Sequence, residues 1–537
     1  MQRWFFTTPW LLIVSTGFAQ TWAVHDLKRP QPEIVHARPQ VSLPAPPGAT
    51  VLFDGSDLSA WRHDDGADAR WKIENGELVV TPGSGNLQTR AVFDDVQLHV
   101  EWMVPESEAQ DQGQNRGNSG VFLMGLYEIQ VLESLGSTTY ADGMAGSVYG
   151  QFPPAVNPGS GIGRWNSYDI FFRSPRFEDS KVVEPASVTV LHNGYTIQDG
   201  RELLGVTRHQ ATAEYHLHAP RLPLVLQDHG DPIHFRNIWI RDLPRWDELP
   251  KTNRAGRLRQ HVEFLAGLDP ARSSRSPGSL LFAAQYIAES LRQAGWAVHF
   301  QDYDADGVMQ RNVVARLGPD AGSLLVVGAH YDCVDGTPGA DDNASGVAGL
   351  IELAGELAKR PMDRPIELVA YTLEEPPFFG TDFMGSVVHA KSLKEAETEV
   401  EGMISLEMVG CYTDRPDSQR YPVAGMETVY PNTGNFLAVV SLPKHREWLD
   451  RFATALGGSM KLPVETLAAP TTVTGIDFSD HRSYWAEGYP ALMLTDTAFF
   501  RSIHYHEASD TPATLDYLRM AEVVDGLLGA LAPASSD

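Results

Sequence analysis

Cysteine is scarce in this chain of 537 residues, which contains only Cys333 and Cys411, and this excludes a disulfide-rich scaffold. Basic residues are also few, because 42 Lys and Arg stand against 69 Asp and Glu and give a formal net charge of −27. That charge argues against nucleic acid as a partner, since phosphates are bound by Lys and Arg. Beyond the N-terminus no apolar run is long enough to cross a bilayer, so we expect no membrane span in the mature chain.

The first residues have the features of an export signal. Arg3 provides a positive start, a short apolar core ends at Phe18, and Ala19 or Ala23 can end a cleavage site of small residues. The core is short for a membrane-spanning helix. We therefore predict a signal peptide over residues 1–23 and an exported protein, periplasmic or secreted. The alternative is a plain apolar tail.

After a Pro-rich segment predicted to be a linker (residues 24–49), the pattern over residues 50–243 is all-β. Short runs of alternating character are separated by Gly, Asn, Asp and Pro, as in a sandwich or jelly roll. In the run Tyr127–Leu132, Glu128 and Gln130 share one face and apolar side chains share the other. A polar sheet face with a carboxylate suits a carbohydrate, but a solvated face has the same pattern, and both readings stay open.

Several motifs of this segment, among them VLFDGSDLSAW, NSGVFL, YEIQVLES and LQDHGDPIHFRNIWIRDL, resemble the 3-keto-disaccharide hydrolase domain family. The resemblance implies a concanavalin-like sandwich that cleaves 3-keto-glycosides, with Glu128, Gln130, Asn118 and His229 as candidate residues. A 3-keto sugar has an acidified proton beside its carbonyl. A base such as Glu128 or His229 is therefore expected to expel the glycosidic group by elimination. A pure carbohydrate-binding role remains the alternative.

A second domain is predicted over residues 258–532, after a polar linker at residues 244–257. Helical patterns here alternate with near-continuous apolar runs, Leu324–Ala329, Ile366–Leu373 and Met403–Leu406. Such runs indicate strands buried on both faces, as in an open, mostly parallel sheet covered by helices. The chain is therefore predicted to be multidomain, an all-β sandwich followed by an α/β domain.

Candidate metal ligands follow each apolar run of this second domain. They are His330, with Asp332 and Asp342 after it; Glu374 and Glu375; Glu407; and, after a fourth run, His504, His506 and Asp510. In open α/β sheets, ligands bind beyond the carboxyl ends of the strands. Imidazole and carboxylate groups are zinc ligands, and buried carboxylates need partners of opposite charge. The pattern therefore predicts a metal centre at this edge of the sheet.

The motifs AHYD, PGADDNASG, TLEEPPFF, SLEMVGCY, SDHRSYW and YHEASDT resemble the co-catalytic zinc aminopeptidase family, which includes glutamate carboxypeptidases and glutaminyl cyclases. The resemblance implies an α/β zinc-exopeptidase fold and two Zn²⁺ ions per chain. It implies a bridging Asp342, one site completed by His330 and Glu407, another completed by Glu375 and His506, a general base Glu374, and supporting carboxylates Asp332 and Asp510 behind the two histidines. Glu407 stands where many relatives have Asp.

The predicted function is an exported dinuclear zinc exopeptidase, preferably an aminopeptidase acting on peptides, fused to a glycoside-directed sandwich. A water shared by two zinc ions becomes a nucleophile near neutral pH, and Glu374 would carry its proton to the leaving amine. A carboxypeptidase, a glutaminyl cyclase, and an inactive peptidase scaffold joined to a carbohydrate-binding module are the alternatives.

The two cysteines each lie just past a strand end that carries candidate ligands. They are therefore possible neighbours above the sheet, and export would permit their oxidation. A disulfide between Cys333 and Cys411 and two separate buried thiols are the alternatives.

Overall fold

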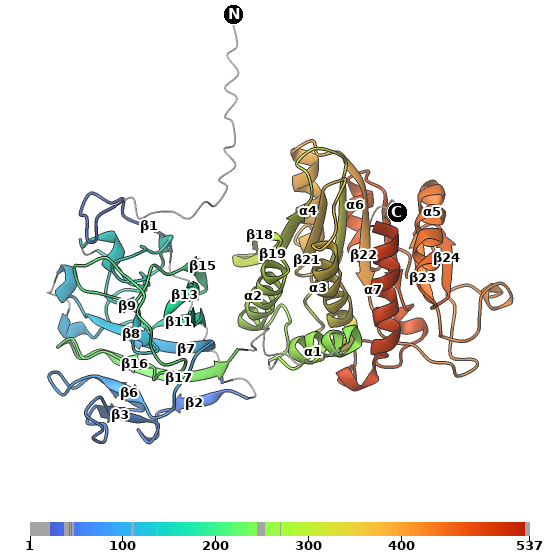
Figure 1. Ribbon diagram of the computed structural model, residues 1–537. Coiled ribbons are helices and arrows are strands. Elements are labelled where there is room, and N and C mark those ends of the chain that lie inside the picture. Colours follow the sequence, from blue (N-terminus) through green and yellow to red (C-terminus); the bar gives the residue numbers. More distant parts are fainter. Residues whose placement is uncertain are drawn as a thin grey trace, which may run out of the picture. The chain divides into compact units, whose positions relative to one another are not determined.

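The computed structural model describes residues 22–36, 42, 44–45, 48–108, 112–136, 138–243, 253–268 and 270–531. The chain divides into two units, residues 1–249 and residues 250–537 (Figure 1). Residues 1–21 of the predicted signal peptide and residues 244–252 of the second predicted linker lie outside the described residues. Within the described part, no helix has the length and apolar character needed to span a bilayer.

The N-terminal unit is the β-sandwich that the alternating pattern predicts. One sheet has the order β15 (Tyr195–Glu202), β14 (Ser187–His192), β11 (Asn166–Arg173), β7 (Val96–Met103), β17 (His234–Asp242), β5 (Glu77–Val79), β4 (Lys72–Glu74), with β2 (Thr50–Phe53) also paired to β17. A further sheet has the order β3 (Trp61–His63), β6 (Leu87–Thr89), β16 (Val225–Leu226), β8 (Ser119–Leu123), β9 (Tyr127–Val131). A short hairpin joins β12 (Arg176–Glu178) and β13 (Lys181–Glu184).

Apolar side chains of both sheets meet in one core of this unit. Leu98 and Val100 of β7 and Tyr127 and Ile129 of β9 belong to it. Because side chains alternate along a strand, Glu128 lies on the opposite face of β9 from its apolar neighbours. The fold thus separates a packed face from a face that carries polar groups.

Residues 22–36, which we call the N-terminal strap, are fastened to the sandwich. Strand β1 (Glu33–Ile34) pairs in parallel with β10 (Val156–Asn157). The Arg29 guanidinium donates a hydrogen bond to the carbonyl oxygen of Gln151 at 3.1 Å. The composition of this segment predicts a spacer, but here its backbone and side chains have specific partners on the sandwich.

The C-terminal unit is an α/β domain whose parallel centre is flanked on each side by a strand of opposite direction. Its sheet has the order β18 (Ala297–Ala305), β19 (Val308–Leu317), β21 (Ile366–Tyr371), β20 (Leu324–His330), β22 (Val400–Glu407), β25 (Ala491–Thr495), β23 (Leu437–Ser441), β24 (Val464–Ala468). Strands β21, β20, β22 and β25 run parallel, whereas β19 and β23 are antiparallel to their inner neighbours. The predicted apolar runs form this parallel centre.

Helices cover both faces of the sheet. They are α1 (Arg254–Ala266), α2 (Pro277–Gln293), α3 (Gly346–Leu357), α4 (Gly385–Glu395), α5 (Arg446–Gly458), α6 (His481–Ala486) and α7 (Tyr517–Leu531). Leu324 and Val326 of β20 pack in one cluster with Tyr484 of α6. Leu325 and Val327 are equally buried and by alternation point to the other face, where α3 contacts β20 (Figure 1). This burial on both faces explains the continuous apolar run.

Candidate metal centre

The carboxyl ends of the parallel strands bring the candidate ligands together. His330 is the last residue of β20, and Glu407 is the last residue of β22. Glu374 and Glu375 follow β21, and Asp342 lies in the turn that precedes α3. Since neighbouring parallel strands end at the same edge of the sheet, residues far apart in the chain meet there.

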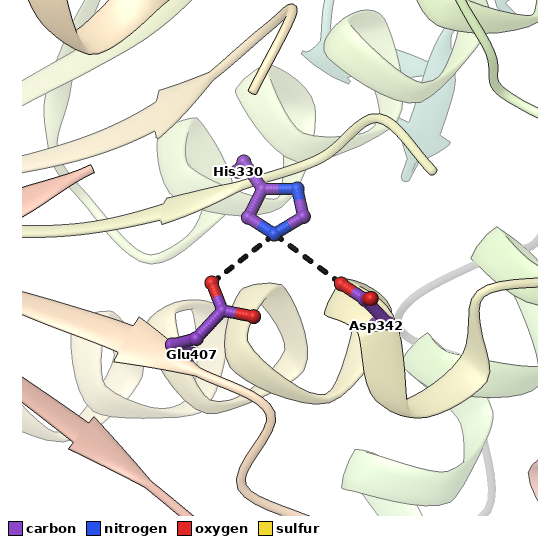
Figure 2. A group of neighbouring side chains, drawn as sticks. All are labelled: His330, Asp342 and Glu407. Carbon is purple, nitrogen blue, oxygen red and sulfur yellow. Dashed lines mark ion pairs between the residues drawn. The ribbon is translucent and has the colours of Figure 1, made fainter. Parts of the chain in front are cut away.

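One group of ligand atoms converges around His330 (Figure 2). Its Nε2 atom lies 3.4 Å from Asp342 Oδ1 and 3.3 Å from Glu407 Oε2. Zinc ligands at about 2.0–2.1 Å in a tetrahedron lie roughly 3.3 Å from one another. The observed separations therefore fit three donor atoms that surround one small cation.

A second group shares Asp342 with the first. His506 Nε2 lies 3.2 Å from Asp342 Oδ2 and 3.4 Å from Glu375 Oε2. The two oxygens of Asp342 thus face different histidines, Oδ1 toward His330 and Oδ2 toward His506. This is the arrangement that a carboxylate bridging two cations requires.

Burial and mutual repulsion disfavour the charged forms of the glutamates in this cluster. Burial raises the pKa of Glu375 to about 8, and the Asp342 charge acts in the same direction. Burial also raises the pKa of Glu374 well above its usual value, with a contribution from Glu407. Several carboxylates in a buried place are unfavourable unless positive charge lies among them.

Both histidines and one glutamate of the cluster have a nitrogen or oxygen atom that is available to a metal ion. Burial alone would lower the pKa of His330, but Glu407 and Glu374 raise it well above the usual value. His330 Nε2, His506 Nε2 and Glu375 Oε1 are buried and have no hydrogen-bond partner among the described residues. Unpartnered nitrogen and oxygen donors facing an excess of carboxylates fit divalent metal ions such as zinc.

Glu374 stands beside the first group but farther from its histidine. Its Oε2 atom lies 3.9 Å from His330 Nε2, longer than the distances to Asp342 and Glu407. Asp332 holds this segment in place, because its carboxylate accepts hydrogen bonds from the backbone N–H groups of Glu374 at 3.1 Å and Glu375 at 3.0 Å. The same carboxylate lies 3.5 Å from His330 Nδ1. Asp332 thus positions the histidine and the neighbouring glutamates together.

Asp510 supports a different element from the one that the resemblance implies. Its carboxylate accepts hydrogen bonds from the backbone N–H groups of Asp341 at 2.9 Å and Asp342 at 3.1 Å. Within the described residues no hydrogen bond joins it to His506. Asp510 therefore holds the turn that carries the shared carboxylate. The alternative histidine, His504, is turned toward Ser509 Oγ at 2.9 Å from its Nδ1.

Three further residues support the site, and the sequence motifs assign no role to them. Ser479 donates to Glu407 Oε2 at 2.7 Å, and the ring of Tyr505 stacks on His506 at 3.7 Å between centroids. Arg272 is buried and donates to the carbonyl of Pro338 at 2.7 Å, in the loop before Asp342. Ser479 belongs to the motif SDHRSYW, which offers a signal for it, whereas Arg272 belongs to no motif.

The two cysteines are not joined in the structure. Cys333 and Cys411 are both free thiols. Of the two alternatives, the structure therefore has the separate thiols and not the disulfide. Cys333 Sγ instead donates to the carbonyl of Thr337 at 3.4 Å. Burial raises the pKa of Cys411, and the nearby charges of Asp496 and Asp341 add to this effect. Burial also raises the pKa of Cys333, to about 11, so both thiols are poorly ionised at neutral pH.

A largely apolar pocket opens beside the metal-ligand cluster. Glu407 and Tyr505 form part of its wall. The other side chains that line it include Tyr421, Tyr430, Phe436, Phe478 and Met493. The pocket gives the site room for an apolar side chain next to the groups that would perform chemistry.

The candidate residues of the sandwich are only partly brought together. Gln130 donates to Asn118 Oδ1 at 3.1 Å, and its own Oε1 has no partner among the described residues. Glu128 is buried on the same strand, and burial raises its pKa to about 8. His229 lies in an exposed bend. Because Glu128 holds its proton near neutral pH, it suits the role of a proton donor better than that of a base.

Each unit matches a known protein family. Residues 312–531 match the family model of peptidase family M28, and residues 48–241 match that of the 3-keto-alpha-glucoside-1,2-lyase-like domain. The C-terminal unit thus contains the match to peptidase family M28. The uncharacterized protein YfbL of Escherichia coli is 42% identical over 305 residues, which cover 55% of this chain and 93% of YfbL. The chain belongs to the same family as YfbL.

More distant relatives carry names of known activities. Leucine aminopeptidase 1 of Chaetomium globosum is 23% identical over 292 residues, 51% of this chain and 65% of that protein. The zinc aminopeptidase BSAP of Bacillus subtilis, a solved structure, is 16% identical with a TM-score of 0.42, and the match covers 53% of this chain and 95% of BSAP. The chain therefore spans less than two thirds of the length of the fungal relative.

Proposed function

We propose that the C-terminal unit is a dinuclear zinc exopeptidase, an aminopeptidase by type, and that the protein is exported. The observation that carries the proposal is Asp342, whose two oxygens face His330 and His506. Membership of the M28 peptidase family and the names of the relatives support it. Export rests on the predicted signal over residues 1–23.

The residues present would hold the metals and move the proton. His330, Glu407 and Asp342 would bind one zinc ion, and Glu375, His506 and Asp342 the other. When bound, the two ions would polarise the scissile carbonyl and lower the proton affinity of water. Glu374 accepts the proton of the attacking water and passes it to the leaving amine. Asp332 keeps Glu374 in place, because its carboxylate accepts a hydrogen bond from the backbone N–H group of Glu374.

The apolar pocket supports cleavage after an apolar N-terminal residue. We expect Leu and Phe anilides to be hydrolysed with a higher kcat/KM than Asp or Lys anilides. One methylene in an apolar pocket contributes roughly 10–200-fold, and the difference should be at least this large. N-acetylated substrates should resist cleavage. Kinetics on such a panel tests the proposal, and release of C-terminal residues from N-blocked peptides would instead establish a carboxypeptidase.

The remaining alternatives for the C-terminal unit make different demands on the site. A glutaminyl cyclase would release ammonia from peptides with N-terminal Gln and need only one metal, whereas this chain has the donor set for two. An inactive scaffold would not need Glu374, which is present beside the ligands. A peptide with N-terminal Gln, added to the same panel, distinguishes both alternatives, as ammonia release or as no turnover of any substrate.

For the sandwich we propose cleavage of 3-keto-glycosides by elimination. The observation that favours it is Glu128, a buried carboxyl whose raised pKa of about 8 keeps it protonated. A neutral acid at this place would protonate the departing glycosidic oxygen, and Gln130 and Asn118 would bind sugar hydroxyls. This revises the role expected for Glu128, from base to acid. The base is then a different residue.

A further inference from the structure

The N-terminal strap places a histidine on the polar face of the sandwich. The backbone N–H of His25 donates to Asp142 Oδ2 at 3.0 Å, and its Nδ1 lies 3.4 Å from Asp142 Oδ1. The side chain of His25 is only 10% exposed, and Asp142 is fully buried. His25 Nε2 is buried and without a hydrogen-bond partner among the described residues. A carboxylate on one ring nitrogen and a free second nitrogen is the arrangement of an oriented base.

His25 and Glu128 flank the same pair of tyrosines. The ring of His25 lies 3.9 Å from that of Tyr140 and 5.1 Å from that of Tyr149, between centroids. The two tyrosine hydroxyls are 3.0 Å apart. The backbone N–H of Tyr149 donates to the carbonyl of Glu128 at 3.2 Å. Burial raises the pKa of both tyrosines, and the charge of Glu128 adds to it. The two tyrosines therefore contact the His25 ring and lie within electrostatic range of Glu128.

Several contacts fix the strap where it carries His25. Arg29 donates to the carbonyl of Gln151 and lies 3.8 Å from Asp142 Oδ2. Gln31 donates to the carbonyl of Thr139 at 3.0 Å. All of these strap residues precede residue 48, where the match to the lyase-like domain begins. A domain defined by that match would lack the histidine.

We propose that His25, oriented by Asp142, is the base of the elimination in the sandwich, with Glu128 as the acid. The inference rests on the glycoside-cleaving function proposed above. His25 Nε2 takes the proton from C2, beside the keto group. The C–H electron pair becomes the C1=C2 bond, the C1–O bond breaks, and Glu128 gives its proton to the departing oxygen. The products are an unsaturated keto sugar and a free alcohol, and the proton returns from His25 to Glu128 through solvent.

The test uses the full chain and 3-keto-glucosides with two leaving groups, a sugar and nitrophenolate. A sugar alkoxide needs an acid to leave, whereas nitrophenolate does not. His25→Gln should lose about 10²–10⁴-fold in kcat on both substrates, the usual contribution of a general base. Glu128→Gln should lose comparable activity only on the sugar glycoside. His36→Gln is the matched control, an exposed histidine of the same strap, and should equal the wild type.

A second variant guards against a merely structural effect. His25 has a φ of 62°, which glycine adopts readily, so His25→Gly should keep the backbone while leaving space for added imidazole. Imidazole should restore cleavage in this variant. Full cleavage of both substrates by His25→Gln would overturn the role of His25. Loss of activity in His25→Gly that imidazole does not restore would also overturn it. Either result leaves the glycoside function standing. No cleavage by the wild type overturns both.

Discussion

Glu374→Gln should retain zinc and fold but lose about 10²–10⁴-fold in kcat for peptide hydrolysis, the range typical of a general base. The amide is almost the same shape as the carboxylate, yet it cannot accept a proton. Its backbone N–H remains bonded to Asp332, so the neighbouring Glu375 should keep its position. Steady-state kinetics beside metal analysis of the same preparation checks both parts of the prediction.

Glu395→Gln is the matched control for this variant. Glu395 is the exposed last residue of α4, and the same chemical change there should leave kcat unaltered. Near-normal turnover in Glu374→Gln would show that another group takes the proton. Loss of metal together with activity would show that Glu374 is a ligand instead.

Asp342→Asn should lower the zinc content and abolish most turnover, because an amide offers one weak oxygen where the carboxylate offers two charged ones. Loss of a residue that only supports a ligand typically costs about 10–100-fold in metal affinity, so loss of the shared ligand should exceed this. The excess of negative charge in the cluster also falls by one, which weakens its hold on cations. Zinc bound per chain at equal free zinc measures the effect.

Asp335→Asn provides the comparison. Asp335 is an exposed residue of the same loop, and it accepts a hydrogen bond from Ser273 that an amide can also accept. This variant should bind zinc as the wild type does. Full zinc content in Asp342→Asn would remove Asp342 from the bridging position.

The fold was largely predictable, because each unit has a dominant period. The alternating runs of residues 50–243 predict a sandwich, and the continuous apolar runs after residue 258 predict a sheet with two covered faces. The meeting of His330, Asp342 and Glu407 follows from parallel strands that end at one edge. The edge strand β18 lacks such a signal, since it is only partly buried.

The remainder depends on contacts that the sequence does not display. His25 lies in a Pro-rich segment whose composition predicts a spacer, and partners far along the chain, such as Asp142, give it a fixed place. The acid role proposed for Glu128 rests on its burial, which raises its pKa to about 8 and which the sequence does not display. Asp510 holds the turn before α3 because the fold brings the loop that carries Asp510 next to that turn. No motif spacing specifies this contact.

Titration of zinc into metal-free protein, with hydrolysis of a leucine anilide followed at each step, tests the central claim most directly. The account predicts that activity rises with added zinc and reaches its maximum at two ions per chain. Maximal activity at one ion per chain, or full zinc loading without any peptide hydrolysis, would contradict it.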